Sequence, residues 1–124
     1  MSDVVVAPEG WAVQHSPADN AVGTISRAAV ALCKHIVTSI TVSLSGAANT
    51  TALVFVLRDS TTGAGNILWT VKLCNLANTS ETVQVPVNIP GVKGQAVTLE
   101  TTAAPAASSR VTVAMNGYTV VEPV

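Results

Sequence analysis

Residues 34–44 read KHIVTSITVSL, the stretch of the chain with the clearest alternation of side chains. A period of two residues places successive side chains on opposite faces of a β-strand. The even positions from Ile36 to Leu44 are therefore predicted to share one face, with Val37, Ser39, Thr41 and Ser43 on the other. We expect Ile40 and Val42, in the middle of the even set, to belong to the hydrophobic core.

Two further apolar stretches follow this strand. Residues 51–58 (TALVFVLR) are apolar on both faces, which favours a central strand covered on both sides. Residues 59–66 have the glycine-rich composition of a turn, and residues 67–73 (ILWTVKL) are predicted to form a strand whose odd positions face the core. Phe55 and Trp69, on neighbouring strands, are expected to form a cross-strand aromatic contact in that core.

The C-terminal half continues the pattern of short strands. Residues 82–89 alternate again, but Pro86 has no amide donor, which predicts an edge strand or a bulge there. Strands are also predicted over residues 95–102 and 110–121, whereas residues 25–34 are compatible with either a helix or a strand. Six to eight short strands predict an all-β fold: an antiparallel β-sandwich, jelly-roll-like, or a small barrel.

The N-terminal region differs from the rest of the chain. Residues 1–22 contain Pro8, Gly10 and Pro17 and have no sustained period of 2 or 3.6. We therefore divide the chain into an extended N-terminal arm over residues 1–22 and one β-sandwich domain over residues 23–124. Such an arm is suited to reach a neighbouring subunit.

Composition points toward assembly. Only 10% of the 124 residues are charged and 48% are hydrophobic, whereas a soluble domain carries about 25% charge. A surface so poor in charge is suited to being covered by copies of itself or by a larger particle. We expect a homo-oligomer, a trimer before a dimer, because a closed ring removes exposed strand edges.

Charge and hydropathy argue against two classes of partner. The net charge is −1 and the six basic residues are scattered singly, so no basic groove for nucleic acid is predicted. No stretch approaches the roughly 20 apolar residues of a membrane span. The first residues carry an acid and no basic segment, so we expect no membrane partner and no export of the chain.

The titratable residues form no recognisable catalytic or metal-binding pattern. Seven acids and two histidines offer no convergent acid–base pair, and Cys33 with His35 would supply only two metal ligands. Asp59 is typical of a residue that accepts backbone hydrogen bonds in a turn. Cys33 and Cys74 could form one disulfide, but two cysteines in a chain without an export signal favour free, buried thiols. We therefore predict no enzymatic activity, no cofactor and no metal.

Three short motifs carry a resemblance to a known group of proteins. They are Gly10-Trp11, the hairpin from Leu57-Arg58-Asp59 to Ile67-Leu68-Trp69, and the ending Val113-Ala114-Met115-Asn116-Gly117-Tyr118. Over about residues 10–119 the chain resembles a group of small virion proteins of tailed bacteriophages. It departs from that pattern in a longer turn at residues 61–66 and in Cys74. The resemblance implies a β-sandwich or jelly-roll subunit, present in many copies on a phage particle, without catalytic residues. Tyr118 is then expected to bury its ring in the core while its hydroxyl stays paired.

Two functional hypotheses follow from the composition and the resemblance. The first is a capsid decoration (cement) protein, assembled in the bacterial host cytoplasm, that binds the major capsid protein or another virion protein. The alternative is a tail, baseplate or fibre component that contacts a host receptor. For a glycan receptor, only the cluster of Trp11, Asp19 and Asn20 has a suitable composition. The favoured interpretation of Trp11 is instead that it anchors the arm against its own subunit or a neighbour. The sequence leaves the choice between capsid and tail open.

Overall fold

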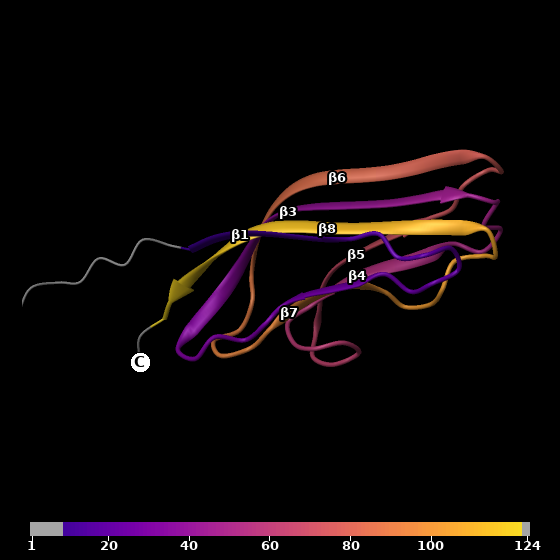
Figure 1. Cartoon of the computed structure of the whole chain (residues 1–124). Coiled ribbons are helices and arrows are strands. Elements are labelled where there is room, and N and C mark those ends of the chain that lie inside the picture. Colours follow the sequence, from indigo (N-terminus) through magenta and orange to yellow (C-terminus); the bar gives the residue numbers. More distant parts are fainter. Residues whose placement is uncertain (1–8, 123–124) are drawn as a thin grey trace, which may run out of the picture.

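The computed structural model describes residues 9–122, which fold into a sandwich of two antiparallel sheets and contain no helix (Figure 1). The predicted all-β sandwich is thereby confirmed. These residues accordingly include no helix long and apolar enough to cross a membrane. The strands are β1 (Glu9–His15), β2 (Thr24–Arg27), β3 (Cys33–Gly46), β4 (Leu53–Arg58), β5 (Ile67–Leu73), β6 (Thr79–Pro90), β7 (Val97–Thr101) and β8 (Ser109–Val121).

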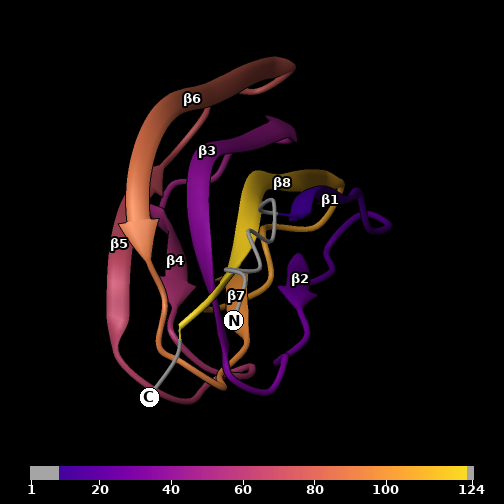
Figure 2. The same cartoon turned by 90° about the vertical axis from the view of Figure 1, so that its left-hand side faces the viewer.

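The strands pair in a nested order. One sheet has the order β1-β8-β3-β6 and the other has the order β2-β7-β4-β5. The first strand thus pairs with the last, the second with the seventh, the third with the sixth, and the fourth with the fifth. Figure 2 shows the consequence: β1 and β2 lie on one side of the sandwich, and β5 and β6 lie on the opposite side.

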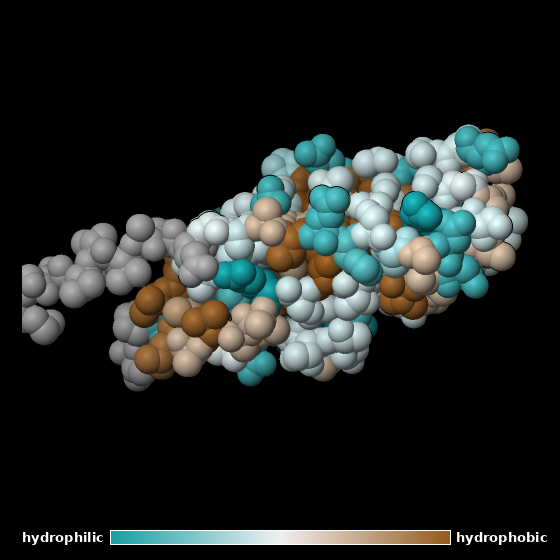
Figure 3. Space-filling model, in the orientation of Figure 1, coloured by the Kyte–Doolittle hydropathy of each residue, from teal (hydrophilic) through white to brown (hydrophobic). Residues whose placement is uncertain are grey.

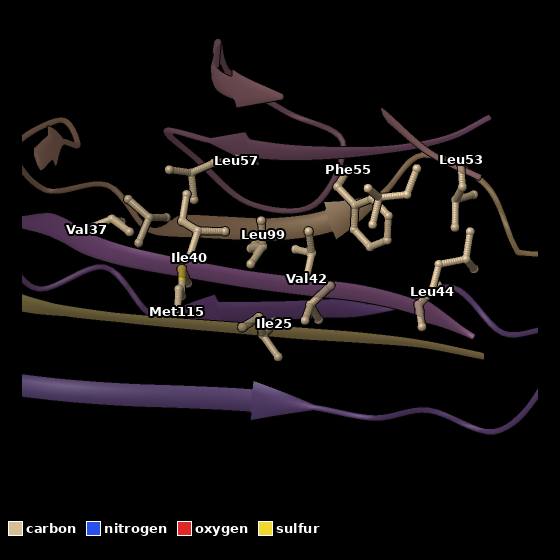
Figure 4. Close-up of a cluster of buried hydrophobic side chains, with 14 of the residues drawn as sticks. Ile25, Val37, Ile40, Val42, Leu44, Leu53, Phe55, Leu57, Leu99 and Met115 are labelled. Atoms are coloured by element: carbon tan, nitrogen blue, oxygen red, sulfur yellow. The ribbon is translucent and has the colours of Figure 1, made fainter. Parts of the chain in front are cut away.

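The core fills the space between the two sheets. Ile40 and Val42 of β3 and Phe55 of β4, the residues that alternation assigns to the core, have no exposed surface. They pack with other fully buried aliphatic side chains from both sheets (Figure 4). The neighbours with no exposure include Val37, Leu44, Leu57, Leu99, Val111 and Val113.

A bulge at Thr38 changes the face on which the residues of β3 lie. Against β8, Thr38 is an extra residue, because Val37 and Ser39 lie opposite the consecutive residues Gly117 and Asn116. The register against β6 also shifts here, but there β6 has the extra residue, since Val37 lies opposite Ile89 and Ser39 opposite Pro86. An extra residue inverts the alternation. His35 and Val37 therefore face the core on one side of the bulge, while Ile36 is only half-buried. The expectation that Ile36 shares a face with Ile40 and Val42 is corrected accordingly.

The predicted edge strand is confirmed as β6. It has a partner on one side only, β3, and Pro86 lies opposite Ser39, where the register shifts. A second shift, between Leu57 and Arg58 of β4, places Ile67 opposite Arg58. Arg58 lies on the outer face of its sheet, so Ile67 is 53% exposed instead of facing the core as the alternation predicts.

Of the two other predicted core aromatics, Trp69 lies at the margin of the core and Tyr118 lies outside it. Trp69 faces the core opposite Leu57 but is only partly buried, and Phe55 lies opposite Val71, so the two aromatic rings are diagonal neighbours. Tyr118 is not in the core cluster. The odd-numbered residues of β8 face inward, which places half-buried Tyr118 on the outer face of its sheet.

Much of the predicted arm belongs to the sandwich. Residues 9–15 form β1, an edge strand that pairs with β8 along its whole length. Residues 16–23 then cross to the other sheet, where Thr24–Arg27 form β2 and the following residues form an exposed loop. The remainder of the arm, residues 1–8, lies outside the described residues. The alternation in β1 was hidden in the sequence by Gly10, which has no side chain to mark a face of the strand.

Candidate functional site

Three loops meet at the end of the sandwich where β3 begins. Backbone hydrogen bonds join them: Gly94 N–H donates to the Cys33 carbonyl (2.8 Å) and Glu122 N–H donates to the Leu32 carbonyl (2.8 Å). The loops expose large apolar side chains, which we call the apolar tip. Its members are Val30 (41% exposed), Leu32 (58%), Val92 (47%) and Val121 (51%). Figure 3 shows hydrophobic surface gathered at this end of the molecule.

Leu32 is the most exposed member of the apolar tip and has an unusual backbone. Its φ is 62°, in the left-handed region that residues with a bulky side chain rarely adopt. The left-handed backbone of Leu32 costs conformational free energy, and its exposed side chain gains no packing in the folded monomer. Contact with a partner is the interaction that this arrangement suits.

A buried hydrogen-bonded cluster supports the base of the tip loop. His35, 1% exposed, contacts the Ala28 carbonyl oxygen through Nε2 (2.7 Å) and Thr119 Oγ1 through Nδ1 (2.7 Å). Trp11 Nε1 donates to the same Thr119 oxygen (3.1 Å). A carbonyl only accepts, so Nε2 donates to Ala28; in the neutral ring, Nδ1 then accepts from the Thr119 hydroxyl.

The aromatic rings complete this cluster. Trp11 and His35 meet edge to face, with ring centroids 5.9 Å apart at 89°. The Arg27 guanidinium lies 5.9 Å from the Trp11 ring centroid, within range of a cation–π contact. His35 and Trp11 thus fix the strand ends from which the tip loop projects. The pairing of these two residues has no local sequence signature, because they are far apart in the chain.

The structure does not bring the three residues of the glycan-binding hypothesis together. Trp11 is buried and lies opposite Gly117, near the end of β8. The backbone of Asn20 donates to the Ser109 carbonyl at the other end of β8, and exposed Asp19 pairs with Arg110 (3.2 Å). These residues are therefore separated by the length of the sheet.

The thiols and acids are placed as follows. Cys33 and Cys74 are both free, but Cys33 is half-buried and Cys74 is exposed, which corrects the expected burial. Within residues 9–122 no group of three or more His, Cys, Asp or Glu side chains is close enough to hold a metal ion. Asp59 accepts from the Asn66 backbone amide (2.7 Å), the turn role that the sequence predicts.

A buried ion pair was missed by the sequence analysis. Arg58 Nε donates to Glu100 Oε1 (2.7 Å), and the Gly63 amide donates to the same oxygen (2.9 Å). The Glu100 side chain is 5% exposed because residues 59–66 fold back over the outer face of their sheet. The only signal in the sequence is that each charge ends an apolar run.

The side of the sandwich formed by β5 and β6 is incompletely closed. Apolar side chains of both edge strands pack against the core but are only partly buried, and we call this row the apolar seam. Its members are Leu68, Trp69 and Val71 of β5 and Val83, Val85, Val87 and Ile89 of β6.

A separate depression of about 270 Å³, lined by residues 48–53 and 103–106, contains no titratable side chain.

Comparisons with known proteins add little to this geometry. No protein-family model matches the chain, and no curated protein matches it. Among solved structures, a chain described as "Bacillus endospore appendages form a novel family of disulfide-linked pili" aligns over 92% of this chain and 95% of that chain. The two are 13% identical and the TM-score is 0.35, a likeness too low to assign a function.

Proposed function

We propose that this protein is a virion structural protein of a tailed bacteriophage, most specifically a capsid decoration (cement) protein. Copies associate with one another and dock on the outer capsid lattice, which they stabilise through apolar contacts and strand-edge pairing. The observation that carries this proposal is the apolar tip: several large aliphatic side chains exposed together at one end of a chain with only 10% charged residues.

The connectivity supports the same class of protein. The first strand pairs with the last, the second with the seventh, and so on to the hairpin of β4 and β5. This is the strand order of a jelly roll. Jelly rolls are frequent among viral capsid domains, although the same fold serves lectins and other functions. The strand order therefore favours a virion subunit without specifying where on the particle it lies.

The apolar tip is the surface we assign to the capsid contact. Its loops project from the end of the sandwich, and the cluster of His35, Thr119 and Trp11 holds their base in one position. A preorganised apolar surface binds with a smaller loss of conformational entropy than a flexible one. Many copies bound to one lattice add their contacts, so modest affinity per copy is sufficient.

The test is binding to expanded, undecorated phage heads. The wild-type protein is expected to co-sediment with the heads and to raise their melting temperature. Leu32→Asn should weaken binding at least tenfold, because Asn tolerates the left-handed backbone but removes the apolar side chain. Leu76→Asn is the matched control: Leu76 is 77% exposed but lies at the opposite end of the sandwich. Failure of the wild-type protein to bind heads would overturn the proposal.

A further inference from the structure

The apolar seam has an open strand edge beside it. Among residues 9–122, β5 pairs with one strand only, β4, so the backbone groups on its other side have no partner strand within this part of the chain. β5 contains no proline and only one charged residue, Lys72, whereas Pro86 and Pro90 interrupt the donors of β6. Of the two edges that flank the seam, β5 is the one able to accept another strand.

We propose that residues 3–6 of a second copy of this chain add as an antiparallel strand to β5 and fill the apolar seam. The inference rests on the self-association part of the proposed function and identifies its interface. The segment reads Asp-Val-Val-Val, and β-branched residues of this kind favour an extended strand. Pro8 then ends the added strand, because it has no amide to donate.

Charge and alternation select one register. Lys72 and Thr70 are exposed on the outer face of β5, whereas Val71 and Trp69 face the seam. Placing Asp3 opposite Lys72 puts Val4 opposite Val71 and Val6 opposite Trp69. In this register both valines enter the seam, Val5 stays outside with Thr70, and the two opposite charges meet across the strands.

The chain's own N-terminus cannot occupy this position. With Val6 opposite Trp69, Glu9 must lie within three residues of β5, which is about 11 Å at full extension. Glu9 instead begins β1, which belongs to the other sheet and lies on the opposite side of the sandwich (Figure 2). Three strand spacings amount to about 14 Å, and the separation between the sheets, at right angles to them, is about 10 Å, so the two ends are about 17 Å apart, beyond the reach of about 11 Å. The donor must therefore be another subunit.

Donation from one copy to the next is a head-to-tail contact. Each subunit gives its N-terminal segment and receives one at β5, so the contact closes a ring when the rotation between copies permits. This arrangement agrees with the expected trimer. A symmetric pairing of β5 with β5 would instead produce a dimer and leave residues 3–6 unused.

Disulfide trapping tests the register directly. In a chain with Cys33→Ser and Cys74→Ser, the pair Asp3→Cys and Lys72→Cys should link subunits covalently under mild oxidation, giving multiples of 12.6 kDa on denaturing gels. The matched control replaces Asp3→Cys with Val4→Cys, whose side chain faces the seam and is directed away from residue 72. Equal cross-linking in the two variants, or none in either, would overturn the proposal.

Charge insertion gives a second, independent readout. Val6→Asp places a carboxylate in the seam and should shift the native protein to the monomer in sizing chromatography with light scattering, whereas Val5→Asp, on the outer face, should leave the oligomer intact. An oligomer unaffected by Val6→Asp refutes this interface. Binding of the wild-type protein to heads is measured separately, so loss of this interface and loss of the proposed function are distinguished.

Discussion

At the scale of single residues, His35 is the buried polar group whose removal should cost most at the apolar end. His35→Ala removes the donor to the Ala28 carbonyl, the acceptor of the Thr119 hydroxyl proton and the ring that packs against Trp11, although Trp11 Nε1 still donates to the Thr119 oxygen. We expect a loss of about 2–4 kcal/mol in the free energy of unfolding, measured in urea. His15→Ala, at an exposed position of β1, is the control and should change it by less than about 0.5 kcal/mol. Equal effects of the two substitutions would show that the cluster does not stabilise the fold.

Glu100 offers a second test among residues. Glu100→Ala leaves the largely buried Arg58 guanidinium and the Gly63 amide without an acceptor, so the free energy of unfolding should fall by about 3 kcal/mol. The more solvent-accessible pair of Lys34 and Glu122, 3.4 Å apart with side chains 29% and 42% exposed, is the comparison. Glu122→Ala should lower that free energy by less than about 1 kcal/mol, because solvent screens this pair. Thermal or urea denaturation of both variants provides the measurement. A loss under about 1 kcal/mol for Glu100→Ala would show that the ion pair of Arg58 and Glu100 does not stabilise the fold.

The residues differ in how far the sequence could predict them. Asp59 was predictable because its partners lie in the same turn, within seven residues. Glu100 was not, because only the tertiary fold brings Arg58 near it. His35 bonds to Ala28, also seven residues away, but its second partner, Thr119, is brought near by the fold alone. Alternation says which side of a strand a residue occupies, and it says nothing about the group opposite.

At the scale of secondary-structure elements, the close approach of β1, β3 and β8 depends on Gly117. A Cβ at this position would collide with the Ile36 carbonyl oxygen and would lie 2.6 Å from the Trp11 ring. Gly117→Ala should therefore lower the free energy of unfolding by about 2–3 kcal/mol in urea denaturation. Gly10→Ala is the control within the same pair of strands, because its Cβ would meet nothing nearer than 4.0 Å. If both glycines tolerate alanine equally, the close packing of Trp11 on Gly117 is not a structural requirement.

The elements show where alternation succeeds and where it fails. The strand over residues 67–73 was predicted with its observed bounds, and Pro86 correctly indicated an edge. The bulge near Leu68 and the extra residue Thr38 of β3 were not predicted, although Pro86, on the partner strand at the second of these shifts, was expected to mark an edge or a bulge. Each shift moved a neighbouring aliphatic side chain out of the predicted face. A bulge depends on pairing with another strand, so one strand's sequence does not reveal it.

At the scale of the whole molecule, the nested pairing joins the two ends of the described chain. β1 pairs with β8 over seven residues, although the two strands are separated by almost the entire sequence. Periodicity predicted most of the strands, but the order in which they pair arises from long-range contacts. For the same reason the sequence suggested an arm over residues 1–22, whereas residues 9–15 form part of a sheet.

Two N-terminal truncations separate folding from assembly. Removal of residues 1–8 leaves β1 in place, so the free energy of unfolding measured at dilute, monomeric concentration should change by less than about 0.5 kcal/mol. Removal of residues 1–15 also removes Trp11 and its bond to Thr119, and it exposes the edge of β8. That truncation should destabilise the monomer by at least about 3 kcal/mol. Light scattering at higher concentration should show that the shorter truncation alone already abolishes the oligomer, because it deletes residues 3–6. If the oligomer survives removal of residues 1–8, the contact between subunits lies elsewhere. If the stability is unchanged after removal of residues 1–15, β1 contributes nothing to the sandwich.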